Sequence, residues 1–285
     1  MTTATTSHAI SRPVGNGRRG KTLRRVLLGL LPVVVLVALW WAGAAALDRP
    51  RVYPTPPLVL EALGAIASGQ GEVGSTYVHI AATILRATAA FAVSLVLGTA
   101  LGIVAGRIPL VFSLLENVIW VFLAVPSIVW VFIFAVALGI SNVVPVAALA
   151  ALLTPMVLVN VAEGAKSVPS DLVEMSRSYH VTTWQRTKGL FLPYLVPYIA
   201  SSARTAFALA LKLVLVAEVV GLATGVGYEV KYWYTRLFMA PIVAWAVVMI
   251  VFGILVDYLV FGRLERWVGR WKGRTAGEVT LGRVE

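Results

Sequence analysis

Six long apolar runs are the feature that most constrains this chain, because each is long enough to cross a lipid bilayer. A helix needs about 20 mostly apolar residues to span the hydrocarbon core. Only 13% of the residues are charged and the mean hydropathy is +0.86, whereas a soluble domain carries about 25% charged residues. We predict an all-α, polytopic membrane protein with six transmembrane helices, at residues 26–47, 80–105, 111–138, 143–162, 195–222 and 240–261.

The net charge of +11 is distributed unevenly over the segments between these runs. Every second connection holds few basic residues, namely Arg49, Arg51, Lys231 and Arg236. Most of the others lie before the first run, after the last run or in the remaining connections: Arg12, Arg18, Arg19, Lys21, Arg24, Arg25, Arg107, Lys166, Arg177, Arg186, Lys188, Arg263, Arg266, Arg270, Lys272, Arg274 and Arg283. This asymmetry predicts that both termini face the cytoplasm. The basic charge is thus an orientation signal, and no nucleic-acid partner is expected.

The chain is accordingly divided into three parts. A basic cytoplasmic tail (1–25) precedes a six-helix transmembrane domain (26–271), and a second cytoplasmic tail (272–285) follows. The small residues Ala44, Ala45 and Ala46 resemble a signal-peptidase site, but the apolar run before them is longer than the ~7–15 residues of a signal-peptide core. We therefore expect the first helix to be retained.

Residues 15–22 match the phosphate-loop pattern GxxxxGKT, which binds ATP when it follows a buried strand in a soluble domain. Here polar residues precede the pattern and a membrane helix follows it. The chain also has no cysteine and three histidines, which leaves little for a metal cluster. We predict no cofactor, metal or catalytic site on this chain.

A polar, basic segment at 163–193 interrupts the apolar runs. Asp171 followed by Glu174, and Thr182 followed by Gln185, are two capping-box patterns. They predict two short helices that meet near residues 179 and 180 at the membrane surface.

This segment resembles the coupling loop of ABC importer permeases, in which Glu-Ala-Ala is followed by Gly and then by Leu-Pro. The corresponding residues here are Glu174-Met175-Ser176, His180 and Leu192-Pro193. Met175 replaces an Ala, and His180 replaces the Gly that would adopt a left-handed turn without steric cost. Further similarity runs through residues 53–56, 79–86 and 192–227, and is greatest to the permeases for nitrate, sulfonates and taurine.

The resemblance implies a type I importer fold in the bacterial inner membrane. It implies a second permease copy or a paralogue, an extracytoplasmic solute-binding protein, and two cytoplasmic ATPases that hold ATP and Mg and grip residues 171–188. This chain would then perform no chemistry itself. The residues implied in coupling are Asp171, Glu174, Met175, Ser176, Arg177, His180, Trp184, Leu192 and Pro193.

One face of the fifth apolar run carries candidates for the solute path. Ser201, Thr205, Ala208 and Lys212 share a helical face, and Arg204 lies beside it. Similar permeases are usually apolar where Lys212 stands. Its ammonium either attracts an anionic solute into the pore, or pairs with Glu218 or Asp257, or snorkels towards the interface.

Other positions have two open interpretations. Trp120 and Trp130, with Pro126 between them, either line the pore along a bent helix or are packing and lipid-facing groups. Arg204, Glu218, Gly225 and Gly227 match positions of the family, which implies structural or gating roles. Separately, small residues recur every four positions at Gly98, Gly102 and Gly106, a spacing that permits close helix packing.

Two other classes of protein remain as alternatives. A secondary transporter would need no ATPase and would contain inverted repeats with ion-coupling carboxylates in broken helices. No such repeat is visible, and the intramembrane carboxylates are mainly Glu116, Glu218 and Asp257. A membrane enzyme would need clustered His, Cys or carboxylate ligands. The function favoured by the sequence is therefore the permease subunit of an ATP-driven importer for a small, anionic solute.

Overall fold

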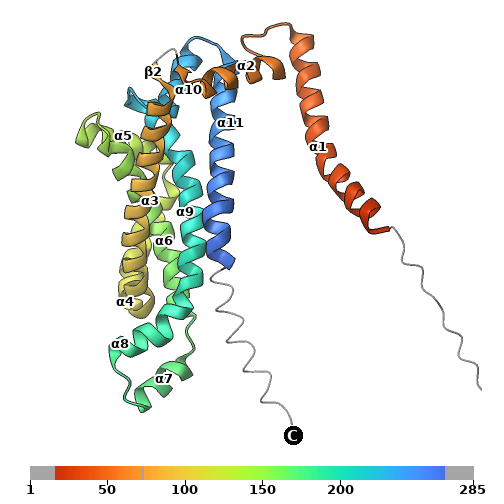
Figure 1. Ribbon diagram of the computed structural model, residues 1–285. Coiled ribbons are helices and arrows are strands. Elements are labelled where there is room, and N and C mark those ends of the chain that lie inside the picture. The colour runs from red at the N-terminus through yellow and green to blue at the C-terminus, as the bar shows by residue number, and fades with distance from the viewer. Residues whose placement is uncertain (1–16, 72–73, 267–285) are drawn as a thin grey trace, which may run out of the picture.

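The computed structural model describes residues 17–71 and 74–266 (Figure 1). Within these ranges the chain is helical apart from one short antiparallel strand pair. The elements are α1 (Gly17–Leu47), α2 (Pro56–Ala67), β1 (Gln70–Gly71), β2 (Gly74–Ser75), α3 (Thr76–Arg107), α4 (Pro109–Ala124), α5 (Ser127–Leu138), α6 (Val143–Lys166), α7 (Ser170–Ser178), α8 (Thr183–Arg186), the π-helix η1 (Thr187–Phe191), α9 (Leu192–Gly221), α10 (Val226–Thr235), α11 (Met239–Val256) and the π-helix η2 (Asp257–Phe261).

The two expected tails fall largely outside the described residues, as does the start of the phosphate-loop pattern at residues 15 and 16. The tail expected at 1–25 is helical from Gly17 onward, because α1 begins there. In Figure 1, α1 runs apart from the bundle for most of its length. The segment expected at 272–285 also lies outside the described residues.

Six uninterrupted spans are not confirmed. Three described helices are long and apolar enough to cross a bilayer, namely Thr76–Arg107, Val143–Lys166 and Met239–Arg266. Two bent pairs raise the number to five if each counts as one span. The described apolar part of α1, Leu31–Leu47, is shorter than these helices.

The run expected as one helix at 111–138 is broken. Helices α4 and α5 meet at 99°, with Val125 extended (φ −76°, ψ 131°) and Pro126 preceding α5. A proline lacks the amide hydrogen that would continue α4, and it pushes the residue before it out of the helical region. The bend expected at Pro126 is therefore present, but as a helix end rather than a kink.

Helices α3, α6 and α9 form the centre of the bundle, with α11 beside α9 (Figure 1). Close contact between α3 and α6 depends on the glycine stripe. A Cβ placed on Gly98 would lie 2.6 Å from Val157 Cβ, and one on Gly102 would lie 2.7 Å from the Leu158 carbonyl oxygen. The expectation that these glycines serve packing is consistent with this geometry.

Gly102→Val should therefore destabilise the bundle, because its new atoms would overlap backbone of α6 that cannot move aside. Overpacking of this kind costs about 1–3 kcal/mol. Thermal unfolding of the purified protein in detergent measures the effect, with Gly64→Ala in α2 as a control, since nothing lies within 4 Å of a Cβ there. An unchanged unfolding temperature for Gly102→Val would contradict the close packing of α3 on α6.

Candidate functional site

The polar segment folds into α7 and α8 at the end of the bundle opposite α2 and α10 (Figure 1). The capping box at Thr182 is confirmed, because its hydroxyl accepts from the Gln185 amide and the Gln185 side chain accepts from the Thr182 amide. The capping box expected at Asp171 is wrong. Helix α7 starts earlier, at Ser170 after Pro169, and has no side-chain cap. Asp171 therefore lies inside the first turn, where its charge suits the helix dipole but its side chain cannot cap.

The two short helices meet at the expected turn, and His180 adopts the left-handed conformation (φ +53°). The Val181 amide donates to the Ser176 carbonyl at 3.1 Å, and the His180 amide donates to the Arg177 carbonyl at 2.9 Å. These two bonds form a Schellman motif, which normally places glycine at the left-handed position. Histidine thus occupies the position at which the resembling permeases use Gly.

The side chains expected in coupling do not all face outward. Ser176 is buried, and its hydroxyl donates to the Val173 carbonyl. Met175 and Trp184 are exposed, with 52% and 73% of their surface accessible. The exposed members on α7, α8 and the turn between them define a surface that we call the docking surface, after the role expected for it: Asp171, Glu174, Met175, Arg177, His180 and Trp184.

Leu192 and Pro193 lie apart from this surface, at the start of α9. Helix α8 continues through the π-helix η1 into α9, so that Thr183–Gly221 forms one helical segment. A π-turn accommodates a local irregularity without ending a helix, and here it ends two residues before Pro193. Of the docking surface, Trp184 therefore lies on the same helical segment as α9, and the members on α7 are connected to it through the turn at His180.

The face of α9 expected to line a solute path is exposed. Ser201, Thr205, Ala208 and Lys212 are accessible, whereas the neighbouring positions on the helix are mostly buried against α3 and α6. No carboxylate of the described residues lies within 4.0 Å of the Lys212 ammonium. The alternative that Lys212 pairs with Glu218 or Asp257 is therefore wrong, since both carboxylates bind arginines.

Arg204 is held by carboxylates rather than presented on that face. Its guanidinium donates to both oxygens of Asp257 at 2.7 Å and to Glu265. These bonds tie α9 to η2 and to the helical turn that follows it. The geometry favours a structural salt bridge over solute contact.

The two tryptophans expected near the pore have different surroundings. Trp120 projects from α4 with 63% of its surface exposed. Trp130 stacks on Phe122 across the break between α4 and α5, with the ring centroids 4.3 Å apart. The stack on Phe122 agrees with the packing interpretation of Trp130, and the role of Trp120 stays a prediction.

Glu218 is completely buried and lies at the centre of an ion network at the end of the bundle away from α7 and α8, which we call the outer end for the orientation expected from the sequence. Its carboxylate accepts from the Thr83 hydroxyl at 2.8 Å, from Arg86 Nη1 at 2.7 Å and from the Gly227 amide at 2.9 Å. A Cβ on Gly225 would overlap this carboxyl group, and Gly225 has φ +118°. Glu218, Gly225 and Gly227 thus belong to one structural unit, which we call the outer network.

Helix α3 supplies the remaining members of the outer network. Arg86 also donates to the Thr224 carbonyl and hydroxyl and to Asn142 Oδ1. The first amides of α10 are satisfied from α3 as well, because Gly225 donates to His79 Nδ1 at 3.1 Å and Val226 donates to Thr83 Oγ1 at 2.8 Å. Sequence reasoning did not assign these roles. The available signal was the spacing of residues 79, 83 and 86, which places three polar side chains on one face of an apolar helix.

Arg86→Met should destabilise the protein far more than Arg204→Met. The first change leaves a fully buried carboxylate without its cation, which typically costs about 3–5 kcal/mol. The second removes a pair that is about half exposed, and such pairs contribute ~1 kcal/mol or less. Thermal unfolding of both variants in the same detergent provides the comparison. Equal decreases in unfolding temperature would contradict the central position of Glu218 in the ion network.

The family described as "Binding-protein-dependent transport system inner membrane component" matches residues 98–270. The taurine transport system permease protein TauC of Escherichia coli (strain K12) is 25% identical over 252 residues, which cover 88% of this chain and 91% of that protein. The putative aliphatic sulfonates transport permease protein SsuC of Bacillus subtilis (strain 168) is 27% identical over 279 residues, 96% of each chain.

The fold is similar to that of a chain in the inward-facing MetNI methionine ABC transporter. The TM-score is 0.54 at 18% identity, and the match covers 75% of this chain and 98% of that chain. The similarity supports the same helical fold. The chain therefore belongs to the family of binding-protein-dependent transport system inner membrane components, the permease subunits of ABC importers.

Proposed function

We propose that this chain forms half of the pore of an ATP-driven importer for a small anionic solute, and that it docks a separate ATPase through α7 and α8. The observation that carries the proposal is the helical segment Thr183–Gly221, which joins the α8 part of the docking surface to an exposed face containing Lys212, a lysine with no ion pair among the described residues. The names of TauC and SsuC, for taurine and aliphatic sulfonates, agree with an anionic group on the solute. A second copy or a paralogue supplies the other half of the pore.

Movement of the ATPases would reach the pore through this segment. A short helix pair fixed by a Schellman turn and a capping box moves as a rigid body. Because α8 continues into α9, displacement of the docking surface tilts the face that carries Lys212. An extracytoplasmic binding protein would deliver the solute at the opposite end.

Glu174→Lys should release the ATPase or uncouple hydrolysis from transport, because it reverses an exposed charge on the docking surface. The measurement is co-purification of the ATPase together with transport in proteoliposomes. Lys231→Glu, a charge reversal at the exposed surface of α10, is the matched control and should retain the ATPase. Full retention and normal transport in Glu174→Lys would remove this residue from the interface.

Cysteine labelling tests how the chain is oriented in the membrane. The native chain contains no cysteine, so it gives no background labelling. Ser170 and Ser75 are both exposed and lie at opposite ends of the bundle. An impermeant thiol reagent added to intact cells should label Ser75→Cys and leave Ser170→Cys unmodified. Labelling of Ser170→Cys from outside would reverse the orientation and exclude cytoplasmic docking.

Lys212 is the residue proposed to select the solute. A lysine within a span costs ~2.5–3.5 kcal/mol on insertion scales, and no described carboxylate offsets this cost. In a homodimer, two ammonium groups would flank the pore axis and attract a sulfonate, a carboxylate or a similar anion.

Lys212→Met should insert and bind the ATPase normally, yet lose most uptake of an anionic solute, because the side chain keeps its length and loses its charge. Lys212→Arg should retain part of the uptake, and Lys231→Met is the control for loss of a lysine elsewhere. Uptake of radiolabelled taurine or an aliphatic sulfonate provides the measurement. Normal uptake by Lys212→Met, or a cationic solute, would leave snorkelling as the role of this lysine.

A further inference from the structure

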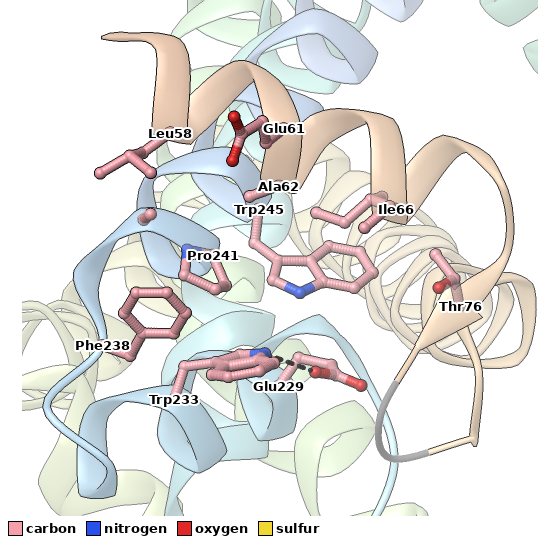
Figure 2. A pocket seen from close by; sticks show the side chains of 12 residues that line it. Leu58, Glu61, Ala62, Ile66, Thr76, Glu229, Trp233, Phe238, Pro241 and Trp245 are labelled. Atoms are coloured by element: carbon pink, nitrogen blue, oxygen red, sulfur yellow. Dashed lines mark hydrogen bonds between the residues drawn. The ribbon is translucent and has the colours of Figure 1, made fainter. Parts of the chain in front are cut away.

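A cleft of about 330 Å³ lies at the outer end of the bundle between α2, α10 and α11, away from the exposed face of α9 (Figure 2). Its walls are mostly apolar and aromatic. Trp233 comes from α10, Trp245 comes from α11, and Phe238 lies in the connection between these helices. This volume is within the range of small-molecule sites.

The charged residues that line the cleft are both acidic. Glu61 is exposed at α2 and Glu229 is 98% buried in α10, and no Lys or Arg of the described residues contributes to the wall. Trp233 Nε1 donates to Glu229 Oε2 at 3.1 Å, which fixes the carboxylate (Figure 2). The cleft therefore disfavours anions.

His79 lies behind Glu229, with 3.6 Å between His79 Nε2 and Glu229 Oε1. Its other nitrogen, Nδ1, accepts the Gly225 amide hydrogen, so the neutral ring carries its proton on Nε2. In that tautomer the Nε2 hydrogen lies on the nitrogen nearer to Glu229.

Two further buried groups line the same wall. Thr76 is 1% exposed, and its hydroxyl oxygen has no hydrogen-bond partner among the described residues. Trp245 is 2% exposed, and Figure 2 shows its indole ring facing Trp233 and Glu229. Buried polar groups in proteins are nearly always satisfied, so an unpaired hydroxyl in the wall of this cleft leaves a hydrogen bond that a polar group of a ligand, such as a hydroxyl, can supply.

We propose that this cleft binds an organic ammonium group. A cation gains from the faces of Trp and Phe rings, by about 2 kcal/mol when desolvated, and from the fixed carboxylate of Glu229. A choline-sized or ethanolamine-sized group fits the volume, and its source is either a free organic cation or the headgroup of a membrane lipid. The bound group would hold α2 against α10 and α11, and it is independent of the anion selectivity proposed for Lys212.

The test is titration of the purified permease–ATPase complex with choline chloride in nanodiscs of phosphatidylglycerol, followed by isothermal calorimetry. The neutral isostere 3,3-dimethylbutan-1-ol and sodium chloride at equal ionic strength are the comparison ligands. Choline should bind and the isostere should not. Glu229→Gln should weaken choline binding at least tenfold, whereas Glu116→Gln on the exposed surface of α4 should leave it unchanged.

Glu61→Lys provides a second variant that does not disturb buried packing, since Glu61 is exposed. Its ammonium at the cleft should also abolish choline binding. Equal binding of the isostere, or unchanged binding in Glu61→Lys and in folded Glu229→Gln, would overturn the proposal. Added phosphatidylethanolamine in the nanodiscs should raise the apparent Kd of choline if lipid headgroups occupy the cleft, and should leave it unchanged if the ligand is a free cation. No choline binding in either membrane would also overturn it.

Discussion

The buried ion pair between Arg86 and Glu218 is the interaction on which the outer half of the bundle depends. A carboxylate with no accessible surface is tolerated only when a cation and further hydrogen-bond donors surround it. Arg86, Thr83 and the amide of Gly227 supply these donors from α3 and α10. The pair thus fixes the end of α9, the start of α10 and the middle of α3 as one body.

The ion pair between Arg86 and Glu218 also holds one end of the continuous helical segment Thr183–Gly221, which runs from α8 through α9. One end of this segment carries the α8 part of the docking surface, and the other end is held by the outer network. Between them the exposed side of α9 presents Lys212, while the glycine stripe of α3 keeps α6 in close contact behind it. Under the proposed function, force applied at α8 would be transmitted along a helix rather than through a loop.

Local patterns in the sequence predicted local geometry well. The capping box at Thr182, the left-handed turn at His180 and the exposed stripe of α9 all depend on residues within a few positions of each other. Pro126 indicated a bend, but its 99° angle depends on how α5 packs on α6 and α9. The Asp171 box failed because the helix starts after Pro169 instead.

Contacts between distant segments were beyond sequence reasoning. Arg86 and Glu218 are 132 positions apart, and periodicity does not indicate which charged residues of different spans meet. The cleft combines side chains from α2, α3, α10 and α11, each of which reads as an ordinary packing residue in its own segment. The partner of Arg204 could not be derived either, because Asp257 follows it after two intervening helices.

Transmission of movement through α9 is tested most directly by two distances between spin labels, measured by double electron–electron resonance on the permease–ATPase complex. Spin labels at Thr183 and Val219, both exposed on the segment from α8 to α9, report whether this segment stays rigid. Labels at Thr205 in two copies report movement of the pore face. Trapping with ATP and vanadate should change the Thr205 distance between copies and leave the distance from Thr183 to Val219 unchanged. A change confined to the distance from Thr183 to Val219, with the Thr205 distance constant, would contradict transmission through α9.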